Sequence, residues 1–184
     1  MRLALHGPPG SGKSTLARLL VEEFSRLNRP TVVVKLAAPL YQLQSLVYTV
    51  AGEPMLDPTM QDGQLLNDLA AHLRRINPDA LTDNFARRVR QAATRYPEAV
   101  LLCDDMRAPD AATLVDLGFH LVRVHAAQEL RLGRKNLRGD LTAGQDDHPT
   151  EASVALDSHH DVRNDGGLED LRQAARTLAR QVAS

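Results

Sequence analysis

Short apolar runs alternate along the chain with longer stretches in which apolar residues recur every three or four positions. The first pattern predicts buried strands, and the second predicts amphipathic helices. The predicted strands are residues 2–6, 31–34, 99–103 and 120–124, with a brief fifth strand around 160–163. The predicted helices are residues 13–27, 39–50, 63–75, 79–95, 109–117, 127–137 and 168–182. Strands that alternate with helices favour an α/β fold, in which helices cover both faces of a parallel sheet.

The bulk composition is that of an ordinary globular domain. The chain has 184 residues, which suits one domain with one hydrophobic core. Hydrophobic residues make up 43% and charged residues 24%, as in typical folded proteins. The formal net charge is -1, so the chain lacks the basic excess with which proteins wrap duplex DNA or RNA. We therefore expect small-molecule partners and no nucleic acid.

Three features bear on the compartment. A single cysteine, Cys103, allows no internal disulfide, so an oxidising compartment is not indicated. No apolar stretch approaches the roughly 20 residues needed to span a bilayer. The segment before Gly7 is too short for the apolar core of a signal peptide. Together they predict a cytoplasmic location and no membrane partner.

A glycine-rich loop follows the first predicted strand and precedes the first predicted helix. Residues 7–14, Gly-Pro-Pro-Gly-Ser-Gly-Lys-Ser, fit the phosphate-binding pattern G-x-x-x-x-G-K-[ST] in full. The glycines let consecutive backbone N–H groups point at an anion, and the positive end of the helix faces the same anion. We expect Lys13 to reach the β- and γ-phosphates of ATP, Ser14 to ligate Mg²⁺, and Thr15 to contact the α-phosphate. The predicted nucleotide-binding residues here are Gly7, Pro8, Gly10, Ser11, Gly12, Lys13, Ser14 and Thr15.

Two aspartates follow the third predicted strand. An acidic residue in this place forms the second half of a nucleotide site, where it holds Mg²⁺ directly or through water. Asp104 follows the apolar run directly, whereas Asp105 alternates with it. Both therefore stay candidate metal ligands together with Ser14.

The loop alone is shared by kinases, GTPases and motor ATPases. The chain has no Asn-Lys-x-Asp element for reading guanine, and it is short for the extra elements of a large ATPase. Arginines stand where a kinase needs them: Arg74 closes the third predicted helix, and Arg107 follows the two aspartates. A kinase brings two phosphorylated substrates together, and the planar guanidinium binds phosphate oxygens well.

A further group of arginines begins a predicted lid. Arg131, Arg134 and Arg138 are spaced i, i+3 and i+7, which puts them on one face of a helix. A polar segment with two glycines, residues 138–150, follows directly. We expect these arginines to approach the phosphates when the segment closes.

Several short motifs resemble one family in the right order. They are Leu36-Ala37-Ala38-Pro39-Leu40, Arg74-Arg75-Ile76-Asn77-Pro78-Asp79, Asp105-Met106-Arg107, His148-Pro149-Thr150-Glu151 and Asn164-Asp165-Gly166. With the phosphate loop, they are similar to motifs of the deoxynucleoside monophosphate kinases of phages and bacteria. Departures from the family pattern at Ala38, Tyr41, Asn67 and Ala108 lie around the acceptor pocket, so they leave the identity of the acceptor open.

The resemblance implies a three-layer P-loop NTPase fold with a five-stranded parallel sheet ordered 2-3-1-4-5. It implies one domain, 1–184, with a core at 1–36, 96–130 and 155–184, an acceptor-binding insertion at 37–95 and a lid at 131–150. By the same resemblance, Arg74 and Arg107 hold the acceptor phosphate, and Arg131, Arg134 or Arg138 close on the ATP phosphates. The turn that begins at Asn164 lies near the adenine.

The predicted activity is transfer of the γ-phosphoryl group of ATP to a (deoxy)nucleoside 5′-monophosphate, with Mg²⁺ as cofactor. The acceptor oxygen is already ionised near pH 7, so the protein needs no strong general base. The predicted catalytic residues are Lys13, Arg74, Arg107, Arg134 and Arg138. Two alternatives stay open: a kinase for another small phosphorylated metabolite or a nucleoside, and a nucleotide-binding regulator without turnover. The sequence is compatible with a monomer or a homodimer.

Overall fold

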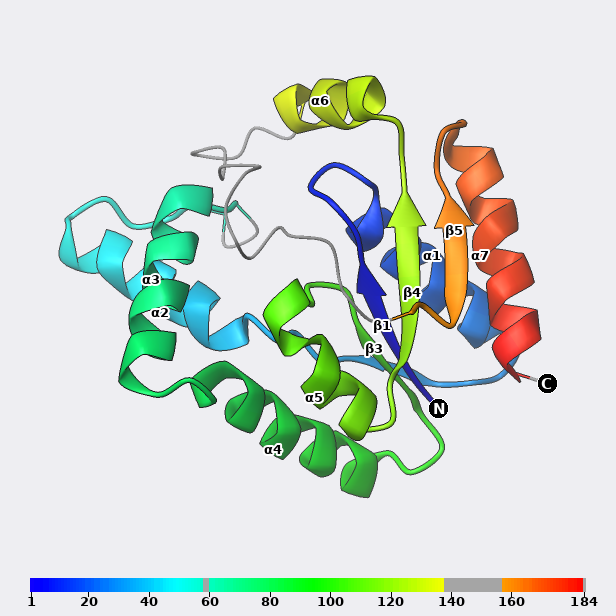
Figure 1. Ribbon diagram of the computed structural model, residues 1–184, viewed down its shortest axis with the longest axis horizontal. Coiled ribbons are helices and arrows are strands. Elements are labelled where there is room, and N and C mark those ends of the chain that lie inside the picture. The colour runs from blue at the N-terminus through cyan, green and yellow to red at the C-terminus, as the bar shows by residue number, and fades with distance from the viewer. Residues whose placement is uncertain (58–59, 138–156, 184) are drawn as a thin grey trace.

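The computed structural model describes residues 1–57, 60–137 and 157–183. It contains one parallel sheet, whose five strands run in the order β2-β3-β1-β4-β5 (Figure 1). The strands are β1 (Arg2–His6), β2 (Thr31–Val33), β3 (Val100–Cys103), β4 (His120–His125) and β5 (His160–Arg163). In register, Ala4 of β1 lies between Cys103 of β3 and Leu121 of β4. The expected strand order and fold class are confirmed.

Seven α-helices and one 3₁₀ turn are found in the described part of the chain. They are α1 (Lys13–Arg26), α2 (Ala38–Val50), α3 (Gly63–Ile76), α4 (Ala80–Arg95), η1 (Ala108–Asp110), α5 (Ala111–Asp116), α6 (Gln128–Leu137) and α7 (Leu168–Ala183). The helix predicted at 109–117 is divided between η1 and α5. The amide of Asp110 donates to the carbonyl of Arg107 at 3.0 Å, a three-residue span that forms a tighter turn than an α-helix. None of the helices in the described ranges combines the length and apolarity needed to cross a membrane.

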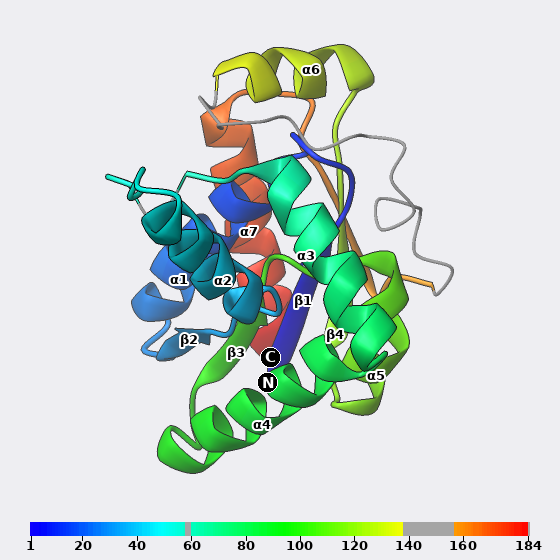
Figure 2. The same ribbon diagram turned by 90° about the vertical axis from the view of Figure 1, so that its left-hand side faces the viewer.

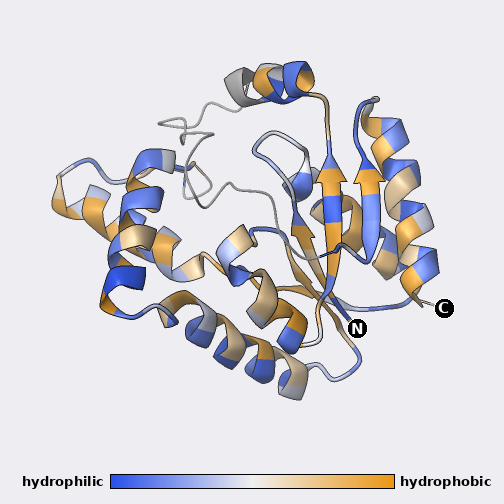
Figure 3. Ribbon diagram, in the orientation of Figure 1, coloured by the Kyte–Doolittle hydropathy of each residue, from blue (hydrophilic) through white to orange (hydrophobic). Residues whose placement is uncertain are grey.

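The strands bury side chains on both faces, as expected for a parallel sheet. Leu3 and Leu5 of β1 point into a cluster formed with α1 and α7. Ala4 points to the other face, where Phe85 of α4 and Leu114 of α5 pack. Hydropathy differs across the sheet: the central strands β1 and β3 are largely apolar, whereas the edge strand β5 is mostly hydrophilic (Figure 3).

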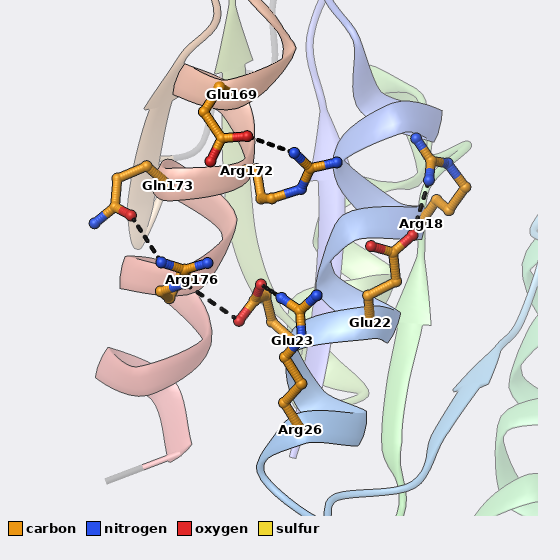
Figure 4. Close-up of polar contacts among 8 residues, drawn as sticks. All are labelled: Arg18, Glu22, Glu23, Arg26, Glu169, Arg172, Gln173 and Arg176. Carbon is orange, nitrogen blue, oxygen red and sulfur yellow. Dashed lines mark hydrogen bonds and ion pairs between the residues drawn. The ribbon is translucent and has the colours of Figure 1, made fainter.

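A buried carboxylate fixes α7 against α1. Glu23 of α1 is only 5% exposed. It forms an ion pair with Arg26, and its Oε2 lies 3.7 Å from Nε of Arg176 on α7 (Figure 4). A buried charge is tolerated when it is paired in this way. The contact thus joins the helix that begins at the glycine-rich loop to α7.

The segment predicted as an acceptor-binding insertion, residues 37–95, contains helices of two kinds. In α4, Phe85 and Val89 are fully buried in the same cluster as β3, so this helix belongs to the layer that covers the sheet. Helices α2 and α3 pack on each other and stand beside the carboxyl ends of the strands (Figures 1 and 2). Acceptor binding by residues 37–95 stays a prediction.

Candidate active site

The glycine-rich loop joins β1 to α1, and its backbone requires glycine at both ends. Gly7 has a φ of 141°, and a Cβ there would lie 2.3 Å from the carbonyl oxygen of Val124. Gly12, which caps α1, has a φ of 100°, and a Cβ there would lie 2.2 Å from Nδ2 of Asn164. Residues with a Cβ rarely adopt such angles. The loop therefore curls so that its amides and the start of α1 form an anion site.

Two side chains of the loop are placed for an anion. Nζ of Lys13 folds back over the loop and donates to the carbonyls of Gly7, at 2.7 Å, and Pro8, at 3.1 Å. Ser11 is fully buried, and its hydroxyl has no hydrogen-bond partner among the described residues. An unsatisfied buried hydroxyl is costly, so a phosphate oxygen at the loop would satisfy it. Ser14 is exposed on the first turn of α1.

Asn164, at the end of β5, supports the loop from the side. Its side-chain Nδ2 donates to the Ser11 carbonyl at 2.8 Å, and its backbone amide donates to the His125 carbonyl at 2.7 Å. The residue is 5% exposed. Both the side-chain amide and the backbone amide of Asn164 therefore donate to backbone carbonyls. The place near an adenine that the resemblance implies for the turn 164–166 stays a prediction.

Helix α6 lies over the loop at the carboxyl ends of the strands (Figure 1). Nη1 of Arg131 donates to the Pro9 carbonyl at 3.3 Å, and Nη1 of Arg134 donates to the Asn164 carbonyl at 3.1 Å. Both of these predicted lid arginines thus reach the region of the phosphate loop. Arg138 lies outside the described residues, as do the rest of the predicted lid, to residue 150, and the motif at 148–151.

The two aspartates after β3 have different partners. Asp104 is 4% exposed and accepts a bond from Nζ of Lys35 at 2.6 Å. Asp105 accepts bonds from the backbone amides of Leu36, at 2.7 Å, and Ala37, at 3.1 Å. Burial, with the neighbouring Asp104 adding to it, raises the pKa of Asp105. Asp105 therefore fixes the turn that leads into α2. Asp104 holds the ammonium of Lys35 at the carboxyl ends of the strands.

A cavity lies between α2, α3 and the segment that follows β3. Its apolar lining includes Leu36, Leu40, Leu66 and Leu81, and its polar lining includes Tyr41, Gln61, Asn67, Arg74, Asp105 and Arg107. The structure thus brings the two predicted acceptor arginines into one cavity. Burial and the charge of Asp105 raise the pKa of the Tyr41 hydroxyl, so this hydroxyl stays protonated. It lies 3.5 Å from Oδ2 of Asp105.

Arg74 is oriented by a buried carboxylate. Its Nη2 donates to Oδ1 and Oδ2 of Asp110 at 3.0 and 3.1 Å. Asp110 is 2% exposed, and the Arg74 side chain is 20% exposed. A guanidinium held by a carboxylate is prepositioned for a second anion.

Sequence reasoning missed Lys35 and Asp110. The signal for Lys35 is its place directly before the segment 36–40, and the signal for Asp110 is its position three residues after Arg107. Neither signal identifies a partner, because each partner comes from a distant part of the chain.

The oxygen donors at the loop fit Mg²⁺. A serine hydroxyl and a carboxylate are hard ligands of the kind that Mg²⁺ prefers. In the described ranges, no group of three or more His, Cys, Asp or Glu side chains could hold a metal alone. Mg²⁺ in phosphoryl-transfer sites commonly binds one or two protein oxygens together with substrate phosphates. Ser14 and Asp104 carry oxygens of this kind, and their binding of Mg²⁺ stays a prediction.

Solved structures of similar fold include known kinases. TT1252 from Thermus thermophilus is 20% identical with a TM-score of 0.56, and the match covers 100% of this chain and 98% of that one. The Mycobacterium tuberculosis APS kinase CysC, solved with AMPPNP and APS, is 14% identical with a TM-score of 0.54, covering 100% and 97%. A gluconokinase from Sinorhizobium meliloti is 15% identical with a TM-score of 0.54, covering 99% and 93%. At these identities the likeness establishes the fold, a P-loop kinase-like one.

A comparison with curated proteins gives no match. A protein-family model described as AAA domain matches residues 2–138, which include the phosphate loop, the aspartates after β3, and α6. The matched range is well over half of the 184 residues. The chain therefore belongs to this AAA-domain family of P-loop proteins.

Proposed function

We propose that the protein is a kinase that transfers the γ-phosphoryl group of ATP to a (deoxy)nucleoside 5′-monophosphate, giving ADP and the nucleoside diphosphate. One observation carries the proposal: the phosphate loop and a cavity lined by Arg74 and Arg107 lie at the same carboxyl edge of the sheet. A donor site alone would serve any nucleotide-binding protein. A second cationic cavity beside it is the feature that a phosphoryl transfer between two anionic substrates requires.

The donor side consists of the loop amides and Lys13. The ammonium of Lys13, which donates to the carbonyls of Gly7 and Pro8, would exchange these for β- and γ-phosphate oxygens. Charge-assisted bonds to phosphate are stronger than bonds to neutral carbonyls, so the exchange is favourable. The buried hydroxyl of Ser11 would gain an acceptor at the same time.

The acceptor side consists of the cavity. Arg74, fixed by Asp110, and Arg107 would hold the acceptor phosphate. The leucines of the wall would contact the base and sugar, and the amides of Gln61 and Asn67 would supply polar contacts. The acceptor oxygen attacks without a general base, because it is already ionised.

Mg²⁺, when bound, would neutralise negative charge that develops during transfer. Ser14 and Asp104 would hold it. Both oxygens of Asp105 accept backbone amides, so we assign Asp105 to support of the acceptor cavity. Arg131 and Arg134 on α6 lie near the loop and would close over the phosphates together with Arg138.

The comparisons support a kinase and leave the acceptor open. The two neighbours named above as kinases, an APS kinase and a gluconokinase, are named for different acceptors. Within the chain, the arginine pair in the cavity favours an acceptor that carries a phosphate over an uncharged one.

An acceptor panel tests the proposal. ADP release from Mg-ATP is measured with all ribo- and deoxyribonucleoside monophosphates, with nucleosides, and with phosphorylated and unphosphorylated sugars. We expect turnover with at least one nucleoside monophosphate at a kcat/KM that exceeds that of every non-nucleotide. Turnover with only a sugar or a nucleoside would replace the proposed acceptor. Binding of ATP with no turnover on any compound would favour a regulator instead.

A further inference from the structure

Lys35 reaches across the carboxyl edge of the sheet. The residue follows β2, and its Nζ lies 2.6 Å from Oδ1 of Asp104, which follows β3. In the sheet, β3 lies between β2 and β1. The ammonium is thus carried from the edge strand to the end of β3, the neighbour of β1, whose end opens into the phosphate loop. The Lys35 side chain is 40% exposed, so its charge faces solvent at this edge.

The backbone on both sides of Lys35 is fixed. The amide of Val34 donates to the Leu102 carbonyl at 2.8 Å, and the amide of Leu36 donates to Oδ1 of Asp105 at 2.7 Å. Leu36 also lines the acceptor cavity. Lys35 therefore differs from an ordinary surface lysine, because its stem starts at a rigid point beside the cavity and its head is held by a buried carboxylate.

Cations are assigned on two sides of the site: Lys13 on the donor side, and Arg74 and Arg107 on the acceptor side. Lys35 immediately precedes Leu36 of the cavity lining, and its ammonium contacts Asp104 at the end of β3, the strand next to β1. Only three of the 22 basic residues are lysines, at positions 13, 35 and 135. A lysine ammonium is a compact charge on a rotatable stem, so it can turn from a carboxylate to a phosphate.

We propose that Lys35 is a further catalytic residue, whose ammonium binds phosphate oxygens where donor and acceptor meet. The inference rests on the proposed kinase function. In the transfer, an acceptor phosphate oxygen forms a bond to the γ-phosphorus, the bond from that phosphorus to the β–γ bridging oxygen breaks, and its electron pair leaves with ADP. The Lys35 ammonium offsets the negative charge at the junction and takes no part in proton transfer.

Two probes separate the junction from the donor site. AMPPNP occupies the donor site alone, whereas diadenosine pentaphosphate and adenosine–thymidine pentaphosphate span donor and acceptor with one phosphate chain. Affinities are measured by titration calorimetry, and the pentaphosphate that binds wild type more tightly is used for the variants. Failure of both pentaphosphates to bind wild type more tightly than AMPPNP overturns the nucleotide acceptor and the role of Lys35 with it.

With a pentaphosphate that wild type binds tightly, Lys35→Met tests the residue itself. Loss of one charge-assisted bond predicts that pentaphosphate affinity falls by about 10- to 100-fold, while AMPPNP affinity changes by less than about threefold. Lys35→Arg keeps the charge and is expected to retain most of the pentaphosphate affinity. Arg18→Met removes an exposed positive charge on α1 and controls for the general electrostatic field. Equal losses for both probes, or no loss, overturn the role of Lys35 and leave the kinase proposal standing.

The simpler role of Lys35 is to neutralise Asp104, and a second pair of variants excludes or establishes it. In Asp104→Asn a neutral amide replaces the carboxylate. A lysine whose only role is to neutralise Asp104 is then no longer needed. We expect Lys35→Met in the Asp104→Asn background to lower pentaphosphate affinity by a factor similar to that in wild type. Identical affinities for Asp104→Asn and the double variant would overturn the proposal. This pair also carries the test if Lys35→Met alone, with an unpaired buried carboxylate, fails to fold.

Discussion

The side-chain amide of Asn164 donates to the carbonyl of Ser11 at 2.8 Å, so the end of β5 is bonded directly to the phosphate loop. The two residues are 153 positions apart in the chain. The same asparagine accepts a bond from Arg134 of α6 at its carbonyl. The loop, the sheet and α6 therefore meet at one buried residue, and a change there is expected to alter nucleotide binding as well as stability.

Asn164→Ala tests this junction. The Ser11 carbonyl loses its partner in a buried place, which costs about 1–3 kcal/mol of unfolding free energy. We expect a loss in that range in urea denaturation, together with weaker AMPPNP binding. Gln42→Ala, on the exposed side of α2, serves as the control and should change stability by less than about 0.5 kcal/mol. Unchanged AMPPNP affinity in Asn164→Ala would mean that the bond supports the fold but not the loop.

Gly12→Ala tests the close approach of Asn164 to the start of α1. The added Cβ would lie 2.2 Å from Nδ2 of Asn164, at a φ of 100°. Gly52→Ala is a matched control, because Gly52 has a φ of 82° but a Cβ there meets nothing within 4 Å. The left-handed backbone costs each variant about 1–2 kcal/mol. We expect Gly12→Ala to lose clearly more, and to lose AMPPNP binding, in the same assays. Equal losses of unfolding free energy in the two variants would show that Asn164 moves to accommodate the added Cβ without a measurable loss of stability.

Much of the fold could be predicted because its signals are local. Apolar runs of strand length, helical periodicity and the complete phosphate-loop pattern lie within short windows, and the family resemblance supplied the strand order. Periodicity shows which face of a helix is apolar but not what the face packs against. The pattern of α4 therefore does not reveal that Phe85 and Val89 pack in the core cluster against the sheet.

The candidate site was harder, because its decisive contacts are long-range. Asp104 and Asp105 are adjacent in sequence, and only their partners at Lys35, Leu36 and Ala37, nearly 70 positions away, distinguish them. The orientation of Arg74 likewise depends on Asp110, 36 positions further along the chain. Patterns of residue types indicate that cations and carboxylates gather at one sheet edge, but not which cation each carboxylate holds.

Lys13→Ala should separate transfer from folding. Nζ of Lys13 donates to the backbone carbonyls of Gly7 and Pro8, and the loss of a hydrogen bond to a neutral acceptor costs only about 0.5–1.5 kcal/mol. We expect the phosphoryl transfer rate to fall by about 10²–10³-fold or more. The far-ultraviolet circular dichroism spectrum and the urea midpoint should stay close to those of wild type. Wild-type turnover in this variant would remove the loop from the assigned active site.

Asp110→Asn tests whether the buried carboxylate positions Arg74 for the acceptor. The variant keeps the shape of the side chain but weakens its hold on the guanidinium, which is worth about 1.5–3 kcal/mol for a charged pair. We expect the KM for the acceptor to rise by about tenfold or more, with little change in the Kd for AMPPNP. Asp116→Asn, an exposed position on α5, is the control. A parallel loss of AMPPNP affinity would point to general damage rather than to orientation of Arg74.

His6 gives the protein a pH-dependent stability that can be isolated by substitution. The residue is 4% exposed, directly precedes the phosphate loop, and its Nε2 lies 2.8 Å from Oγ of Ser158. Burial, with the nearby charges of Arg123 and Lys13 adding to it, lowers the pKa of His6 from 6.5 to about 4. Between these two values the unfolded chain binds a proton that the folded chain does not. The contribution of His6 therefore lowers the unfolding free energy as the pH falls through this window, and it is constant above it.

The measurement compares wild type with His6→Gln, whose side chain does not titrate. Urea unfolding at pH 7.5, 5.5 and 4.5 should show wild type losing stability relative to His6→Gln as the pH falls, with a slope of at most about 1.4 kcal/mol per pH unit. His72→Gln removes an exposed histidine on α3 and controls for the general effect of replacing a histidine. Other groups that titrate act on all three proteins alike, so only the difference between curves is interpreted. Parallel curves for wild type and His6→Gln would mean that His6 accepts a proton in the folded state as readily as in the unfolded one.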